Sequence, residues 1–280
     1  MTVTMFAAGA AATALLIRKR TWKVPGEQGA TAAVLMLGLG TYLISDECPV
    51  GRWLYLATGY GYLDTVLGHL LWIGATIALL HQTLYRLAER DERAQILDAL
   101  VRWPVTLMVP LMLSAMLMSA VMQKHPDVDL GSVNAETGWL VAYRVVWYVT
   151  LVYLTCLLIR VLRIVRSTSS GPSRITNLYL AASWLVLAAV AVRMASYWDS
   201  LGHLAEVVEW LRCLAVVAVA TAAAWSWLGK MWPHRGLLWH TRTSRRSLRL
   251  DTIDAHRMRT HAPPPPRCMF DDQPPEAAVS

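Results

Sequence analysis

The sequence predicts an all-α protein of the cell membrane: a polytopic bundle of seven transmembrane helices with its N-terminus outside and its C-terminus inside. Its 280 residues are 55% hydrophobic and only 16% charged, whereas about 25% of residues in typical soluble proteins are charged. The mean hydropathy is +0.38, and basic residues flank the apolar runs. We therefore expect a membrane domain over residues 1–228, a basic juxtamembrane segment over 229–262 and a proline-rich disordered tail over 263–280.

The first two spans are short. The first apolar run, Val3–Ile17, has no basic residue before it and is followed directly by Arg18 and Lys19. This order is the reverse of a secretory signal peptide, so we expect an uncleaved span that starts outside. A span of about 15 residues is short for a bilayer, so Arg18 and Lys19 are expected to extend their side chains to the headgroups. The second span covers residues 29–45 and leads into an external loop over 46–58.

The third span, Tyr62–Leu84, is the one around which we expect the others to pack. It carries three ionisable residues, Asp64, His69 and His81. At ~100° per residue these point in well-separated directions, so no single face of the helix can shelter all three from lipid. Gly68 lies on the same stripe as Asp64, which predicts that another backbone approaches closely there.

The remaining spans alternate with polar loops. We expect Pro110 to kink the fourth span, and its methionines to be flexible apolar filling rather than a soft-metal path, because no Cys or His alternates with them. These four spans are predicted at residues 103–122, 139–159, 177–196 and 210–228.

The basic residues give the orientation. The chain has a net charge of +7, which could suggest nucleic acid, but most of its 26 Lys and Arg residues lie in loops of one side and in the tail. Only Arg52 and Lys124 lie in loops predicted outside. The positive-inside rule then places residues 46–58, 123–138 and 197–208 outside, and we expect no nucleic-acid partner.

A layer of ionisable residues lies near the outer ends of the predicted spans, within roughly 8 to 10 Å of the boundary. One interpretation is structural: the side chains extend to the headgroups or form ion pairs such as Glu209 with Arg212. The other is a water-filled vestibule with an anion-attracting floor. The candidate ligand-binding residues of this layer are Asp64, His69, Arg144, Arg193, Glu209 and Arg212.

Charge placement within this layer suggests partners. A carboxylate near the bilayer boundary needs a cation, so we expect Asp64 to pair with Arg144 or Arg193. The surplus positive charge would then attract an anion, because a guanidinium matches a carboxylate or phosphate. For His69 a buried neutral ring with one hydrogen bond and a proton-coupled role both stay open.

The tail combines arginines with apolar residues. The stretch Arg235–Leu250 suits a helix lying on anionic inner-leaflet lipids, and an unstructured basic anchor is the alternative. The candidate membrane-surface residues are Trp239, Arg242, Arg245, Arg246 and Arg249.

No cofactor or metal is expected from the sequence. On the predicted topology Cys48 is outside and Cys268 is in the tail, so only the two cysteines within spans, Cys156 and Cys213, could approach each other. No metal-ligand spacing, phosphate loop, nucleophile elbow or HExxH pattern occurs. An enzyme is the less favoured hypothesis, because Asp64 and His69 diverge by about 140° on one helix.

Three short segments carry a resemblance: Leu67–Leu71 in the third span, the charged stretch Glu89–Arg93 after it, and Leu237–Trp239 beyond the seventh. With seven spans and an outside N-terminus, the chain resembles the membrane domain of an actinobacterial family of integral membrane proteins described as transporters, over roughly residues 2 to 250. Many members of that family continue into a larger cytoplasmic domain, where this chain has its proline-rich tail. The resemblance implies the topology and a transport role, but no substrate and no catalytic residue.

Two functions are therefore expected. The first is a small transporter-like module for an anionic or zwitterionic solute, with the charged layer as its entrance. The second is a seven-helix sensor or interaction protein that signals through its basic tail.

Overall fold

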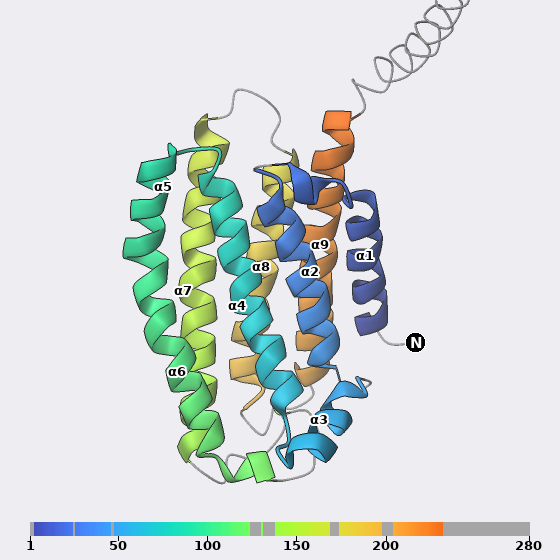
Figure 1. The fold of residues 1–280 in the computed structure, drawn as a ribbon, viewed down its shortest axis with the longest axis vertical. Coiled ribbons are helices and arrows are strands. Elements are labelled where there is room, and N and C mark those ends of the chain that lie inside the picture. Colours follow the sequence, from blue (N-terminus) through green and yellow to red (C-terminus); the bar gives the residue numbers. More distant parts are fainter. Residues whose placement is uncertain are drawn as a thin grey trace, which may run out of the picture. The chain divides into compact units, whose positions relative to one another are not determined.

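The computed structural model describes residues 3–24, 26–45, 48–123, 130, 138–168, 174–197 and 204–231. Within these ranges the regular secondary structure is entirely helical, so the predicted all-α class is confirmed. The chain divides into two compact units, Met1–Leu228 and Gly229–Ser280. The first unit, whose helices are labelled in Figure 1, contains both cavities described below.

The described residues form nine α-helices, and a π-helical turn over Asp98–Arg102 joins the fifth to the sixth. Two short 3-10 turns, Thr21–Lys23 and Ala120–Gln123, precede α2 and follow α6. The helices are α1 Val3–Ile17, α2 Gln28–Leu43, α3 Val50–Thr58, α4 Leu63–Leu84, α5 Arg90–Leu97, α6 Trp103–Leu117, α7 Gly138–Thr168, α8 Arg174–Ala195 and α9 Ala205–Met231.

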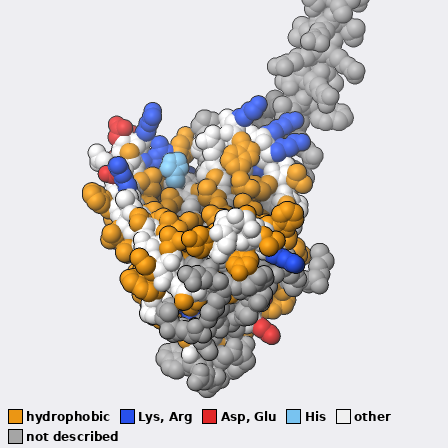
Figure 2. Space-filling model, turned by 60° about the horizontal axis from the view of Figure 1, so that its bottom comes forward, with side chains coloured by type: hydrophobic (Ala, Val, Ile, Leu, Met, Phe, Trp, Pro, Cys, Tyr) orange, Lys and Arg blue, Asp and Glu red, His pale blue; other side chains and the backbone are white. Residues whose placement is uncertain are grey.

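Within the part of the chain that the structure describes, five helical segments are long and apolar enough to cross a membrane. The helices α1 and α2 are apolar but shorter. Figure 2 shows hydrophobic side chains over the flank of the bundle and charged ones gathered mainly towards the end that carries α5, a distribution compatible with a membrane protein. The five segments are Leu63–Leu84, Arg90–Leu117, Gly138–Thr168, Arg174–Ala195 and Glu206–Met231.

Two predicted loops contain helix. The loop expected over residues 46–58 holds α3, which exposes Trp53 and Leu56 and is too short for its periodicity to stand out. The loop expected over 85–102 is helical from Arg90 onward, because Glu89 and Glu92 form a capping box at its start. The charged side chains that suggested a loop are also good helix formers.

Helix α4 lies between α2 and α7 (Figure 1), and of its three ionisable residues Asp64 is buried, His69 is partly buried and His81 is exposed. The close approach expected at Gly68 is made with α2: a Cβ at Gly68 would lie 2.9 Å from the Gly40 carbonyl oxygen, and a Cβ at Gly40 would lie 2.9 Å from that of Gly68. Two glycines facing each other thus let the backbones of α2 and α4 touch. A larger residue at either position would push the two helices apart.

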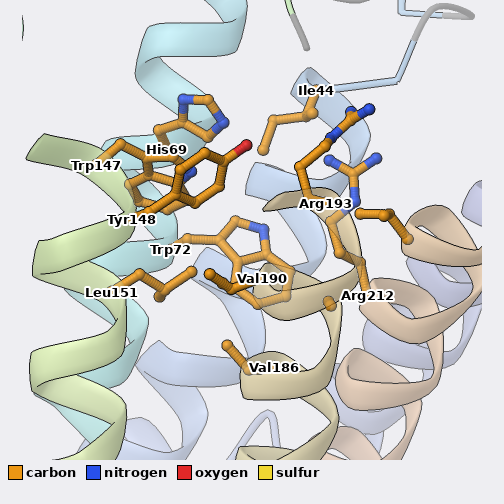
Figure 3. A pocket seen from close by; sticks show the side chains of 12 residues that line it. Ile44, His69, Trp72, Trp147, Tyr148, Leu151, Val186, Val190, Arg193 and Arg212 are labelled. Carbon is orange, nitrogen blue, oxygen red and sulfur yellow. The ribbon is translucent and has the colours of Figure 1, made fainter. Parts of the chain in front are cut away.

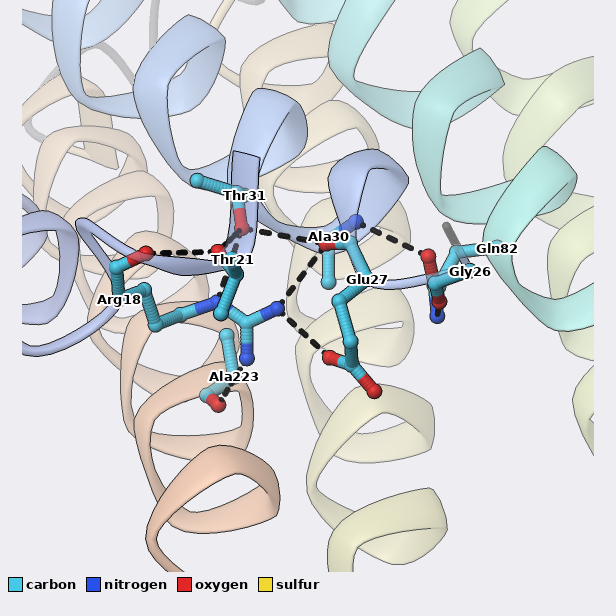
Figure 4. Close-up of polar contacts among 8 residues, drawn as sticks. All are labelled: Arg18, Thr21, Gly26, Glu27, Ala30, Thr31, Gln82 and Ala223. Carbon is cyan, nitrogen blue, oxygen red and sulfur yellow. Dashed lines mark hydrogen bonds and ion pairs between the residues drawn. The ribbon is translucent and has the colours of Figure 1, made fainter. Parts of the chain in front are cut away.

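Arg18 does not extend to the headgroups, contrary to the sequence-based expectation. Its side chain is fully buried, with Nη2 2.8 Å from Glu27 Oε2 in an ion pair. Nε donates to Thr31 Oγ1 at 3.1 Å, and Nη1 donates to the carbonyl oxygen of Ala223 in α9 at 2.6 Å (Figure 4). Because α1 ends at Ile17, Arg18 turns inward where α2 begins, and the packing of α9 closes over it.

We predict that Arg18→Met lowers the free energy of unfolding by about 3 to 5 kcal/mol, because it removes the cation of a buried ion pair. Denaturant unfolding in detergent measures the change, and adding Glu27→Gln should recover part of it. Arg102→Met is the matched control, since Arg102 also pairs with a carboxylate, Asp98, but on an exposed helix face. An equal or larger loss from Arg102→Met would contradict the prediction.

Candidate functional site

A cavity of about 60 Å³ lies between the end of α2 and the helices α4, α7, α8 and α9 (Figure 3). This volume has room for roughly four or five water molecules. We call it the arginine cavity. Its lining residues are Ile44, His69, Trp72, Trp147, Tyr148, Leu151, Val186, Ala189, Val190, Arg193, Val208 and Arg212.

Two arginines form one wall of the arginine cavity. Arg193, near the end of α8, is only 8% exposed, and Arg212 reaches the same space from α9. In Figure 3 both guanidinium groups lie on the same side of the cavity, across from His69 and Tyr148. None of the residues that line the cavity is a carboxylate. Two like charges that share a small space repel each other, so an anion between them would be stabilised.

The arginine cavity also contains two hydrogen-bond donors without a partner. Nε1 of Trp72 and Nε of Arg212 are buried, and neither atom has an acceptor in the part of the chain that the structure describes. A buried N–H group without an acceptor costs about 1 to 3 kcal/mol. A ligand that accepts hydrogen bonds from both groups would remove this cost.

An aromatic wall faces the arginines. Nδ1 of His69 lies 2.6 Å from the hydroxyl oxygen of Tyr143, and the imidazole stacks on Trp147 with ring centroids 4.2 Å apart. Tyr143 is buried in α7, so this hydrogen bond fixes the orientation of the imidazole. Tyr148 completes the wall, and its hydroxyl oxygen lies 3.3 Å from that of Tyr197. His69 is therefore hydrogen-bonded but only partly buried, and its ring lines the cavity.

Asp64 forms no ion pair with Arg144 or Arg193, so the predicted pairing is wrong. Its carboxylate is buried at the start of α4 and lies so close to Gly51 of α3 that a Cβ there would overlap it. The first turn of α4 turns Asp64 towards α3. Asp64 is therefore absent from the lining of the arginine cavity.

Arg144 and Glu209 also lie outside the lining of the arginine cavity. Nη2 of Arg144 donates to the carbonyl oxygen of Leu130 at 2.6 Å, and its guanidinium carbon lies 5.1 Å from the ring centroid of Tyr197. Glu209 forms no ion pair with Arg212 and instead accepts a hydrogen bond of 2.6 Å from the Thr4 hydroxyl of α1. Of the six predicted residues, the cavity thus brings together His69, Arg193 and Arg212.

Sequence reasoning missed most of the aromatic wall. Trp72 could be linked to His69, because the two lie three residues apart on one helix. Trp147 and Tyr148 carried no comparable signal, since they reach the cavity only through the packing of α7 against α4. No group of three or more His, Cys, Asp or Glu residues that could hold a metal ion occurs among the described residues.

The candidate membrane-surface residues of the tail lie outside the residues that the structure describes. They are Trp239, Arg242, Arg245, Arg246 and Arg249.

Cys48, between α2 and α3, provides a probe of the Asp64 charge. Burial raises the pKa of the Cys48 thiol above its ordinary value of 9.0, and the nearby Asp64 carboxylate raises this pKa further. We predict that, with the other cysteines replaced by serine, Cys48 is alkylated slowly at pH 8 by iodoacetamide and faster only above pH 9.

Asp64→Asn removes the negative charge, so the pKa of Cys48 should fall and the alkylation rate at pH 8 should rise. The same protein unfolded in denaturant is the control, because there the substitution should have no effect. A rate that is unchanged or lower in folded Asp64→Asn would contradict the prediction.

No protein-family model matches this chain, and the comparisons with curated proteins and with solved structures gave no match either. The resemblance to an actinobacterial membrane-protein family stays a prediction, and the interpretation of the site rests on its geometry.

Proposed function

We propose that this protein is a transporter-like module of the cell membrane that binds a small anionic solute in the arginine cavity. The observation that carries the proposal is the composition of this cavity: two arginines, two buried N–H donors without an acceptor, and no carboxylate among the lining residues. Charged residues inside a membrane bundle are expensive and mark solute or ion pathways by default. A pocket that leaves buried donors open is suited to a ligand that accepts hydrogen bonds.

The solute is anionic rather than zwitterionic. An ammonium group in the arginine cavity would meet two guanidinium groups and no carboxylate. The aromatic rings could hold a cation only weakly against that repulsion. The same cavity offers an anion charge-assisted hydrogen bonds from Arg193 and Arg212.

All seven apolar helices span the bilayer in this proposal, with the N-terminus outside and the C-terminus inside. The helix α1 is roughly 22 Å long at 1.5 Å per residue, which is shorter than the ~30 Å hydrocarbon core. Local thinning of the bilayer accommodates such a mismatch. Support comes from the packing of α1 on α2 and of α2 on α4, which makes both short helices part of the bundle.

The sensor function would act through the basic tail, which the structure does not describe, and no contact of the described residues favours it. A transport role also agrees with what the resemblance to the actinobacterial family implies.

We predict that Arg212→Gln and Arg193→Gln each weaken acetate binding by 10- to 100-fold, since a buried hydrogen bond to a charged group contributes about 1.5 to 3 kcal/mol. Quenching of tryptophan fluorescence in detergent measures binding, and uptake of labelled acetate into proteoliposomes measures transport. Arg163→Gln is the matched control, because Arg163 lies on the exposed face of α7 and packs over Trp184. Equal weakening by Arg163→Gln would contradict a specific role for the cavity.

Cysteine labelling of intact cells tests the proposed topology. In a chain without other cysteines, a cysteine at Ser132 should react with a membrane-impermeant maleimide, whereas one at Ser169 should react only after permeabilisation. The reverse pattern would refute the proposed orientation.

A further inference from the structure

A second cavity, of about 30 Å³, adjoins the arginine cavity. The side chains of Trp72 and Val186 line both, so the two cavities are neighbours that share these residues as a wall. We call the second one the apolar cavity, because its other walls are mostly aliphatic. They include Leu37, Leu79, Leu158, Ala215 and Val219.

The apolar cavity offers little to a charged group. No charged residue is among its lining residues. Two of its three hydroxyl groups are already donated within their own helices, that of Thr76 to the Trp72 carbonyl oxygen at 3.0 Å and that of Ser183 to the Tyr179 carbonyl oxygen at 2.8 Å. The third belongs to Thr155. An alkyl group fits this environment better than any ionised group.

The indole of Trp72 lies between the arginine cavity and the apolar cavity, with its polar N–H and its apolar six-membered ring on different sides. Its ring nitrogen, the buried donor without an acceptor, is on the side of Arg193 in Figure 3, and its six-membered ring extends towards Val186. A ligand that passes along this indole therefore meets a hydrogen-bond donor first and a hydrocarbon surface next.

We propose that the solute is a short-chain aliphatic monocarboxylate. Its carboxylate lies in the arginine cavity, where Arg193, Arg212 and the Trp72 N–H bind it, and its alkyl chain reaches past Trp72 into the apolar cavity. The inference rests on the proposed function and adds the substrate class: one negative charge followed by a few methylene groups. Each methylene that leaves water for an apolar cavity should strengthen binding about fourfold, until the cavity is filled.

The test is a series of straight-chain sodium carboxylates from acetate to hexanoate, titrated into the full-length protein in detergent. The wild-type dissociation constant should fall about fourfold per added methylene over the first members of the series. In Ala215→Val, which fills the apolar cavity, acetate affinity should stay within about twofold of wild type while the gain with chain length disappears. The matched control is Ala218→Val, one turn further along α9 and outside both cavities, which should keep the wild-type gain.

Each outcome has one meaning. If the wild-type affinity does not rise with chain length, the inference is overturned. It is also overturned if Ala215→Val keeps the wild-type rise, because partition of the longer chains into detergent would then explain it. In both cases acetate binding that depends on Arg212 leaves the proposed function standing. Absence of Arg212-dependent binding for every carboxylate overturns the proposed function and the inference with it. If thermal unfolding shows that Ala215→Val is not folded, the same titration is made with Ala182→Val on α8, which fills the same cavity.

Discussion

The buried ion pair between Arg18 and Glu27 is the interaction on which the arrangement of the bundle depends. A guanidinium group with no exposure to solvent has to find its acceptors inside the protein. Arg18 does so by joining the end of α1 to the start of α2 and, through the Ala223 carbonyl oxygen, to the middle of α9. At the other end of α1, Thr4 donates to Glu209 of α9. Helix α1 is thus fastened to α9 by polar contacts at both of its ends.

This fastening has a consequence for the arginine cavity. Glu209 lies one turn before Arg212 in α9 and would be its natural partner. Because Thr4 binds Glu209 instead, no carboxylate neutralises Arg212 within the described part of the chain. The carboxylate of Asp64 lies against Gly51 of α3 and forms no ion pair with Arg193. Neither carboxylate is therefore among the residues that line the arginine cavity, whereas Arg193 and Arg212 are.

Under the proposed function, the groups that line the arginine cavity favour an anionic ligand. Repulsion between the two guanidinium groups and the open donors at Trp72 and Arg212 both oppose the unliganded state. Proteins use such pre-formed polar groups to bind ligands, because the groups need no reorganisation on binding. The hydrogen bond between His69 and Tyr143 and the stacking on Trp147 hold His69 in a fixed orientation opposite the arginines.

The seven apolar helices among the described residues could be predicted from the sequence, because a long apolar run marks each of them. A rise of ~1.5 Å per residue also predicted a similar depth for His69, Arg193 and Arg212. The sequence did not reveal the short helices α3 and α5. It could not determine partners, since these depend on which helices meet and on how each is rotated about its axis. The burial of Arg18 and the contact of Glu209 with Thr4 arise between helices that are distant in sequence. Asp64 lies against α3, in a stretch that was expected to be a loop. The depth of a residue can be predicted from the one helix that carries it. A cavity and its charge depend on how several helices pack together, which the sequence pattern of a single helix does not reveal.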